Sequence, residues 1–252
     1  MKLQRILLAA FLVGSAFVSA SAQTVDEILD KYFAQTGGKD KWMALQSMKM
    51  SGKVKMQGME LPFVAVQKAP NKMKVTATFQ GKEITQPAFD GTTAWSTNFM
   101  TMKPEKMTTE QSENMKEEAQ LQDPFLNYKD KGYKAELMGK ETIEGTECHK
   151  IKLTRKPVKV DGKEEENTEF YFFSVADNVP IMKRTTAKEG QAKGATIEQF
   201  MSDYQEVNGL YFPFTTTIKY NGQVGQTLAV EKVETNVTVD DKEFTFPAEG
   251  GK

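Results

Sequence analysis

The chain has 252 residues, with 33 Lys and Arg against 34 Asp and Glu, so its formal charge is −1. This near-neutral balance of interspersed charges argues against a nucleic-acid partner, because nucleic-acid binding depends on concentrated basic patches. A single cysteine and a single histidine exclude an intramolecular disulfide and a site built from several histidines. We therefore expect no metal and no cofactor.

Residues 1–22 have the three-part layout of a secretory signal peptide. They comprise a charged start with Lys2 and Arg5, an apolar run over 6–18 and small residues at 20–22. The run is shorter than the roughly 20 residues that a membrane-spanning helix needs, and no cysteine stands at the expected cleavage point before Gln23 to carry a lipid anchor. The sequence therefore predicts one monomeric domain over residues 23–252, exported to the periplasm and not itself lipid-anchored, with a formal charge of −3.

Two helices are predicted directly after residue 23. Apolar residues at Val25, Ile28, Leu29, Tyr32 and Phe33 follow the spacing that places all five on one helix face. Thr24 and Glu27 are spaced as a capping box, and the glycines at 37–38 end the helix. A short second helix is expected over 39–46. Each helix has one apolar stripe, so each needs a sheet to cover.

The sheet is predicted to begin at once. From Met48 to Met56 apolar even positions alternate with lysine and serine, which is typical of a half-exposed antiparallel strand. The same alternation recurs at 73–79, with a strand between them at 61–65. Asp-Gly or Asn-Gly pairs mark tight turns, at 90–91, 161–162, 208–209 and 221–222. Further strands are expected at 133–141, 147–155, 168–175, 180–187, 195–206, 210–220 and 226–235. About ten strands in one domain favour a curled sheet. The predicted fold class is mainly β (α+β), a half-open antiparallel β-barrel with helices covering its concave face.

The segment around Trp95 is the most informative part of the chain. The run from Phe89 to Trp95 predicts a turn leading into an aromatic strand, and a methionine-rich stretch follows over 99–107. Methionine is flexible and polarizable, so its clustering suits an apolar ligand of variable shape. Residues 104–128 are polar and are predicted to be helical, with Thr108 and Gln111 as a capping box. The thin apolar face of this helix fits either a lid or an ordinary surface helix.

Catalytic motifs are absent from the sequence. Cys148 and His149 are neighbours in a predicted strand, so their side chains point to opposite faces and cannot form a nucleophile–base pair. The sequence lacks the serine-hydrolase elbow, the phosphate loop and the zinc-protease helix motif. We predict a non-enzymatic protein, with a hidden pair of carboxylates as the enzymatic alternative, because such a pair leaves no mark in a sequence.

Taken in order, these pieces resemble the LolA-like and LolB-like family of periplasmic lipoprotein carriers. The matching pieces span nearly the whole predicted mature chain: the first helix, residues 68–73 leading a strand, the Asp-Gly-x-x-x-Trp element at 90–95, the helical interruption, the later strands and Phe-Thr-Phe-Pro at 244–247. The resemblance implies a half-open barrel with an apolar interior and a helical lid, which carries acyl chains of lipoproteins or other lipids. It implies an inner-membrane release complex and an outer-membrane acceptor as partners. The family's arginine that holds the lid closed is replaced here by Ala69, with Lys68 beside it.

Two groups of residues are predicted to form the binding site. The residues expected to line the cavity are Met48, Met50, Met56, Phe63, Met73, Phe79, Trp95 and Phe214. The residues expected at its mouth or lid are Phe99, Met100, Met102, Met107 and Met115. The alternative for each lining residue is that it fills a closed core. The alternative for the protein is an envelope sensor or interaction module that uses the same barrel to detect lipids or lipoproteins.

Overall fold

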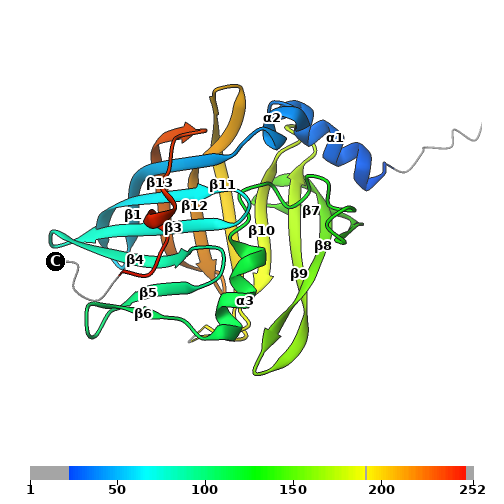
Figure 1. Ribbon diagram of the computed structural model, residues 1–252. Helices are drawn as coiled ribbons and strands as arrows, with labels where there is room; N and C mark the ends of the chain where they lie inside the picture. The colour runs from blue at the N-terminus through cyan, green and yellow to red at the C-terminus, as the bar shows by residue number, and fades with distance from the viewer. Residues whose placement is uncertain (1–22, 191, 248–252) are drawn as a thin grey trace, which may run out of the picture.

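The computed structural model describes residues 23–190 and 192–247. These residues form one 13-stranded antiparallel sheet with three α-helices (Figure 1). The strand order from edge to edge is β6-β5-β4-β3-β2-β1-β13-β12-β11-β10-β9-β8-β7. The predicted mainly β fold is confirmed, whereas the predicted signal peptide lies outside the described residues. Within the described ranges, no helix combines the length and apolar character needed to cross a membrane.

The structure contains all the predicted strands, several of them longer than predicted, and two further strands, β4 and β6. The first six are β1 (Ser47–Met56), β2 (Met59–Lys68), β3 (Lys72–Phe79), β4 (Lys82–Phe89), β5 (Ala94–Asn98) and β6 (Lys103–Lys106). The others are β7 (Lys134–Ile143), β8 (Thr146–Val160), β9 (Lys163–Ser174), β10 (Pro180–Thr186), β11 (Thr196–Val207), β12 (Leu210–Tyr220) and β13 (Gln223–Thr235). The sequence analysis missed β4 and β6. The expectation that residues 104–128 are helical is wrong at both ends, because residues 104–106 belong to edge strand β6 and the helix ends at Glu118.

The helices begin where their capping residues predict. Helix α1 (Val25–Gln35) starts at Thr24 and α3 (Thr109–Glu118) starts at Thr108, and both have complete capping boxes. In each box the threonine hydroxyl accepts from the backbone N–H three residues later in the chain. The side chain of that later residue, Glu27 or Gln111, in turn accepts from the backbone N–H of the threonine. Helix α2 (Lys39–Met43) follows α1, and a short 3-10 helix covers Asp241–Glu243.

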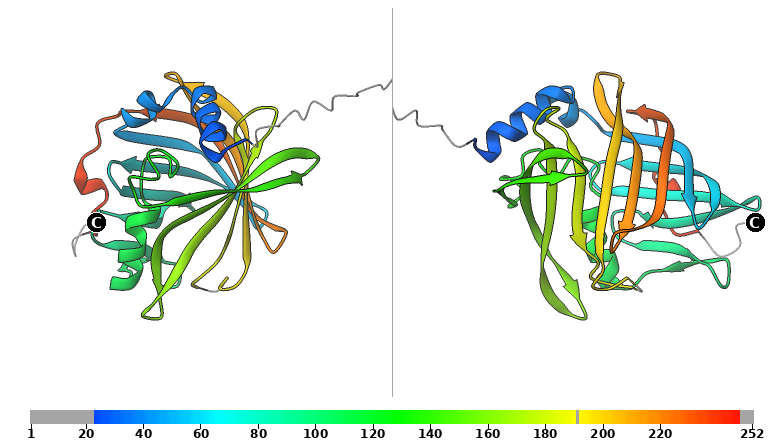
Figure 2. Two further views of the ribbon diagram at one scale, coloured as in Figure 1. Left: turned by 90° about the vertical axis from the view of Figure 1, so that its right-hand side faces the viewer. Right: turned by 180° about the vertical axis from the view of Figure 1, so that it is seen from behind.

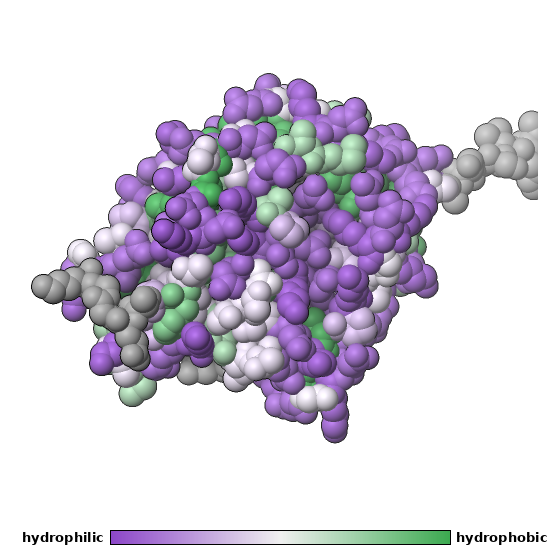
Figure 3. Space-filling model, viewed as in Figure 1, coloured by the Kyte–Doolittle hydropathy of each residue, from purple (hydrophilic) through white to green (hydrophobic). Residues whose placement is uncertain are grey.

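The main hydrophobic core lies between one face of the sheet and the first two helices. Helix α1 buries Ile28, Leu29, Tyr32 and Phe33 in this core, and α2 adds Trp42. From the sheet come residues of β1, β8, β9, β12 and β13, among them Met48, Ile151, Leu153, Phe173, Phe214 and Val233. The molecular face seen in Figure 1 is mainly hydrophilic, with hydrophobic atoms in small separate patches (Figure 3).

Helix α3 shows which face of the sheet is concave. Strands β5 and β8 are the second and the twelfth in the sheet order, yet both contact α3. The Ser112 hydroxyl accepts from the Ala94 backbone N–H of β5 at 3.0 Å. The Asn114 side chain pairs with the backbone N–H and C=O of Lys159 in β8, at 2.9 and 2.8 Å. The sheet must curl for this, and α3 occupies the opening between its two edges (Figure 2).

The two ends of the curled sheet differ. The turns of hairpins β1–β2, β3–β4, β5–β6, β8–β9, β10–β11 and β12–β13 lie at one end, which we call the open rim. Helices α1 and α2 lie at the opposite end, which we call the helical rim (Figure 1). There Gly37, with a φ of +112°, lies so close to the β11–β12 turn that an added Cβ would be 2.0 Å from the carbonyl oxygen of Gly209.

The C-terminal segment covers part of the outer face. Val66, Lys74, Ala88 and Trp95 form one row across β2 to β5 by strand register. The Trp95 indole N–H donates to the carbonyl oxygen of Phe244 at 2.9 Å, and its ring packs edge-on against Phe246. The prediction that Trp95 lines the concave cavity is therefore wrong. The residue belongs to a separate small core between the outer face and the C-terminal segment.

Candidate functional site

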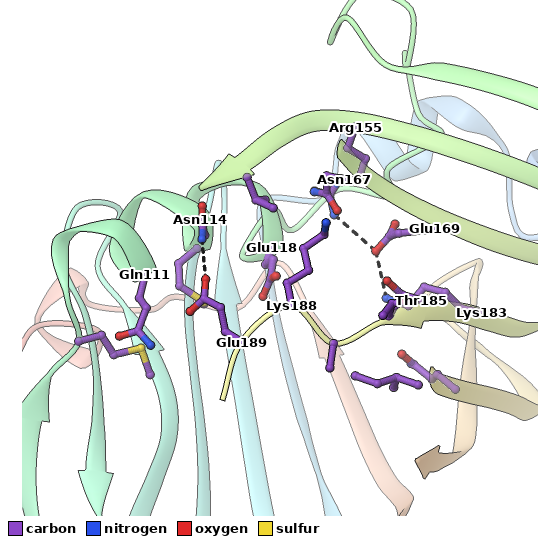
Figure 4. A pocket seen from close by; sticks show the side chains of 17 residues that line it. Gln111, Asn114, Glu118, Arg155, Asn167, Glu169, Lys183, Thr185, Lys188 and Glu189 are labelled. Carbon is purple, nitrogen blue, oxygen red and sulfur yellow. Dashed lines mark hydrogen bonds and ion pairs between the residues drawn. The ribbon is translucent and has the colours of Figure 1, made fainter. Parts of the chain in front are cut away.

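A cavity of about 520 Å³ lies between α3 and strands β8 to β11 (Figure 4). On the helix side it is lined by Met107, Gln111, Asn114, Met115 and Glu118. On the sheet side it is lined by Arg155, Val158, Asn167, Glu169, Lys183, Thr185, Thr186, Ala187, Lys188, Glu189, Ile197 and Gln199. The strand register places Arg155, Asn167, Glu169 and Lys183 on the face that carries the main core. The cavity therefore opens from the interior of the curled sheet.

The lining is more polar than the sequence analysis predicts. It carries three cationic side chains, Arg155, Lys183 and Lys188, and three carboxylates, Glu118, Glu169 and Glu189. Amide and hydroxyl groups lie between them, while Met107, Met115, Val158 and Ile197 supply apolar contacts. Such a lining can hold a polar group of either charge beside an apolar chain.

Arg155 and Glu169 form the centre of the charged part. Both side chains are about nine-tenths buried, and Glu169 lies 3.9 Å from the Arg155 guanidinium and 3.4 Å from the Lys183 ammonium. The Tyr171 hydroxyl donates to Glu169 at 2.9 Å. Burial alone would raise the pKa of Glu169, but Lys183, Arg155 and Tyr171 together lower it below its ordinary value. Glu169 is therefore ionised at neutral pH and compensates two cations.

Arg155 also connects the sheet to α3. Its guanidinium donates to the backbone carbonyl of Glu117 in the last turn of the helix, where cations interact favourably with unpaired carbonyl groups. By contrast, Lys68 pairs with Asp241 on the outer face at 2.8 Å, and Ala69 packs against the main core. The arginine that contacts the C-terminal end of this helix therefore comes from β8 and not from the position before Pro70.

Glu118 has an unfavourable electrostatic environment. The surrounding protein atoms desolvate its carboxylate and raise its pKa, although Lys183 and Arg155 act in the opposite direction. A raised carboxylate pKa means that ionisation of Glu118 costs folding free energy at every pH above that value.

We expect the substitution Glu118→Gln to stabilise the protein at neutral pH. Because the pKa of Glu118 is raised in the folded protein, the gain in the free energy of unfolding is complete at pH values above that raised pKa. The gain disappears below the ordinary glutamate pKa of about 4.3. Thermal unfolding across this pH range measures the effect. Glu113→Gln on the same helix is the matched control, because the hydrogen bond to Lys159 lowers the pKa of Glu113. That control should lose stability at neutral pH; equal shifts in both variants would contradict the assignment.

The structure places the predicted lining residues in three different settings. Met48 and Phe214 belong to the main core under the helices, and Phe63 is also buried. Met73 packs against the small cluster of Phe89, Ala94, Met115 and Ala119 under α3. Met50, Met56 and Phe79 are only partly buried on the same face. Seven of the eight residues thus share the concave face by register, and Trp95 does not.

The five residues predicted at the mouth or lid divide into two groups. Met107 and Met115 both line the cavity. Met115 belongs to the cluster under α3, and Met107 packs against that cluster. Phe99, Met100 and Met102 form the exposed tip of hairpin β5–β6 on the open rim and do not line this cavity.

The sequence reasoning missed the charged lining residues, although a signal for them exists. Along β8 the inward positions read Ile151, Leu153 and then Arg155, and along β9 they read Tyr171 and then Glu169. Each strand thus changes from apolar to charged at neighbouring positions. A charged residue at an inward strand position is costly to bury unless it is paired or functional, so this break in the alternation could have indicated the site.

Cys148 and His149 take no part in the cavity. Cys148 is fully buried in a separate cluster with Ile143, Phe172 and Met182, and His149 faces the other side of β8. Burial raises the pKa of the Cys148 thiol, which disfavours a reactive thiolate. In the described part of the chain, no group of three or more His, Cys, Asp or Glu residues is arranged to hold a metal ion.

Comparison with known proteins supports the fold. No family model matches the chain, and no curated protein matches it in sequence. Among solved structures, the chain is similar to a domain named for outer membrane lipoprotein sorting from Vibrio parahaemolyticus, with a TM-score of 0.54, 9% identity and coverage of 86% of this chain and 94% of that one. It is also similar to a LolA superfamily protein from Nitrosomonas europaea, with a TM-score of 0.52, 13% identity and coverage of 89% and 99%. A DUF1329 family protein from Desulfovibrio piger gives a TM-score of 0.51 and 13% identity, with coverage of 89% and 98%. At these identities the likeness shows that the chain has the fold of LolA-like proteins.

Proposed function

We propose that this protein binds the acyl chains of a lipid or lipoprotein on the concave face of its sheet and carries them through the periplasm without catalysis. The LolA-like fold supports this proposal, because the names of two similar structures refer to lipoprotein sorting or to LolA. The proposal includes delivery of lipoproteins toward the outer membrane, with a release complex and an acceptor as partners.

One observation carries the proposal: a mainly apolar row crosses the concave face outside the hydrophobic clusters under the helices. By register the row runs from Leu61 through Val54, Leu228 and Thr216 to Met201, across five neighbouring strands. Leu61, Leu228 and Met201 are only partly buried. None of the five residues belongs to the main core under α1 and α2 or to the cluster under α3, so the row lies outside both hydrophobic clusters that the helices cover.

The energetics of such a surface fit an acyl-chain ligand. Each buried methylene contributes about 0.8 kcal/mol, so a chain can be held on a curved apolar surface without a specific polar motif. The charged cavity between α3 and β8 to β11 lies on the same face and gives a polar group attached to the chain a place to bind. This division between apolar floor and polar pocket suits an amphipathic ligand.

The proposal is tested by native mass spectrometry of the protein purified gently from the periplasm, followed by organic extraction. We expect a co-purifying acylated species. Absence of any bound species, together with an unchanged mass after incubation with lipids and acylated peptides, would contradict the carrier proposal and favour a sensor or interaction module.

A matched pair of substitutions tests the proposed surface. Leu228→Asp places a charge on the concave face, and we expect affinity for a fluorescent fatty acid to fall about tenfold or more, because a carboxylate would have to be desolvated by the acyl chain. Ala229→Asp is the control, since Ala229 is exposed on the opposite face of the same strand. Equal affinities of the two variants would contradict the assignment of the surface.

A further inference from the structure

The exposed apolar side chains of this protein are not scattered. Six of the eight large hydrophobic residues that are exposed in the described ranges belong to the open rim: Met59, Phe99, Met100, Met102, Tyr220 and Val224. Three of them form the tip of hairpin β5–β6, where Phe99 is 65% and Met100 is 95% exposed. We call residues 99–102 the apolar tip.

The N–H groups of Met100, Thr101 and Met102 in the apolar tip are bonded within the hairpin. The Asn98 side-chain oxygen accepts from the N–H groups of Met100 and Thr101, at 2.8 and 3.1 Å. The Asn98 carbonyl oxygen accepts from the Met102 N–H at 2.7 Å, and the Thr101 hydroxyl accepts from the Lys103 N–H at 3.4 Å. The same bonding occurs at the β4–β5 turn, where Asp90 accepts from the N–H groups of Thr92 and Thr93, so it permits insertion into hydrocarbon without requiring it. In hydrocarbon, every backbone polar group must find its partner internally.

The charges beside the apolar tip fit the headgroup layer of a membrane. Lys103 and Lys106 follow the tip in the same hairpin and both are exposed, while Glu105 between them accepts from the Asn98 amide and the Thr101 hydroxyl, so strand β6 carries a formal charge of +1. Basic residues next to an inserted apolar segment are attracted to anionic headgroups. A protein partner would instead need a pocket to receive a protruding, strongly exposed methionine.

From these observations we propose that the apolar tip inserts into a lipid surface and that the open rim is the membrane-facing end of the protein. The inference goes beyond acyl-chain binding on the concave face, because it assigns a second contact with lipid at a different place. Met107, directly after β6, lines the cavity, so a docked hairpin would bring the cavity next to the bilayer.

Vesicle flotation tests the inference. The full mature chain is mixed with vesicles of phosphatidylethanolamine and phosphatidylglycerol, as wild type, Met100→Asp and Met138→Asp. Met138 is 53% exposed on β7, away from the open rim, and is the matched control. We expect Met100→Asp to weaken vesicle binding about tenfold or more, and Met138→Asp to bind like the wild type. Phe99→Ser is a second, uncharged variant that should weaken binding in the same direction.

Fatty-acid binding in vesicle-free solution separates this inference from the proposed function. All of these variants should bind a soluble fluorescent fatty acid like the wild type. Loss of that binding only in Leu228→Asp would support two separate lipid contacts. The inference is overturned if Met100→Asp floats like the wild type, or if the wild type does not bind vesicles. It is also overturned if the tip instead mediates a dimer that Met100→Asp dissolves in sedimentation.

Discussion

Replacement of Glu169 by alanine should lower the free energy of unfolding by about 3 kcal/mol, because it removes one of the two carboxylates beside a buried cation. The other carboxylate, that of Glu117, lies 3.8 Å from the Arg155 guanidinium. The Arg155 side chain is only 9% exposed, and its Nε has no hydrogen-bond partner in the structure. Without Glu169, Lys183 also loses its nearest carboxylate. Urea-induced unfolding measures the change.

A charge-free double variant separates the loss of the counter-charge from the other effects of removing Glu169. Combining Arg155→Met with Glu169→Leu removes both charges, and this variant should be more stable than Glu169→Ala. The control is Lys152→Ala, on the same strand β8 as Arg155. It removes an ion pair with the exposed Glu166 of β9 and should cost at most about 1 kcal/mol. A cost for Glu169→Ala as small as that of the control would show that Glu117 or solvent, and not Glu169, compensates Arg155.

Replacement of Phe244 by alanine should have an effect of similar size, about 3–5 kcal/mol, because it empties a fully buried aromatic position. Phe244 lies where the C-terminal segment covers the outer face of β2 to β5, and its carbonyl oxygen accepts from Trp95. Chemical denaturation measures the loss of stability. Trp95 emission, recorded in a Trp42→Phe background, should shift to the red as water reaches the indole.

Phe246→Ala is the comparison for this prediction. Phe246 packs edge-on against Trp95 but remains partly exposed, so its removal should cost clearly less than removal of Phe244. If both variants lose the same stability, the C-terminal segment acts as one unit and Phe244 has no special role in the outer core.

Most of the fold could be predicted from local periodicity. The helix spacing and capping residues of α1, and the alternation in β1 and β3, depend only on neighbours in the sequence. Strand β4 was missed because its alternation changes phase: a register shift relative to β3 lets both Ile84 and Phe89 face the same side. Strand β6 was missed because its sequence, Lys-Pro-Glu-Lys, has no apolar residue at all.

The candidate site was predicted less well, for two physical reasons. An aromatic residue in a strand indicates burial but not which face buries it, and Trp95 is covered by a segment about 150 positions later in the chain. The charged lining was missed because a search for an apolar cavity discounts charges. Arg155 and Glu169 become neighbours through the pairing of β8 with β9. The predicted turn at 161–162 indicates that pairing, but the register shift between Arg155 and Val158 has no mark in the sequence.

Strand β6 has a consequence for the protein in solution. A curled sheet that is not closed has free edges, and a free edge can pair with another chain and start aggregation. At β6 this hazard is countered by four exposed residues, of which Pro104 has no N–H to donate and the other three are charged. The β6 edge can therefore stay uncovered without offering another chain a template for intermolecular β-pairing.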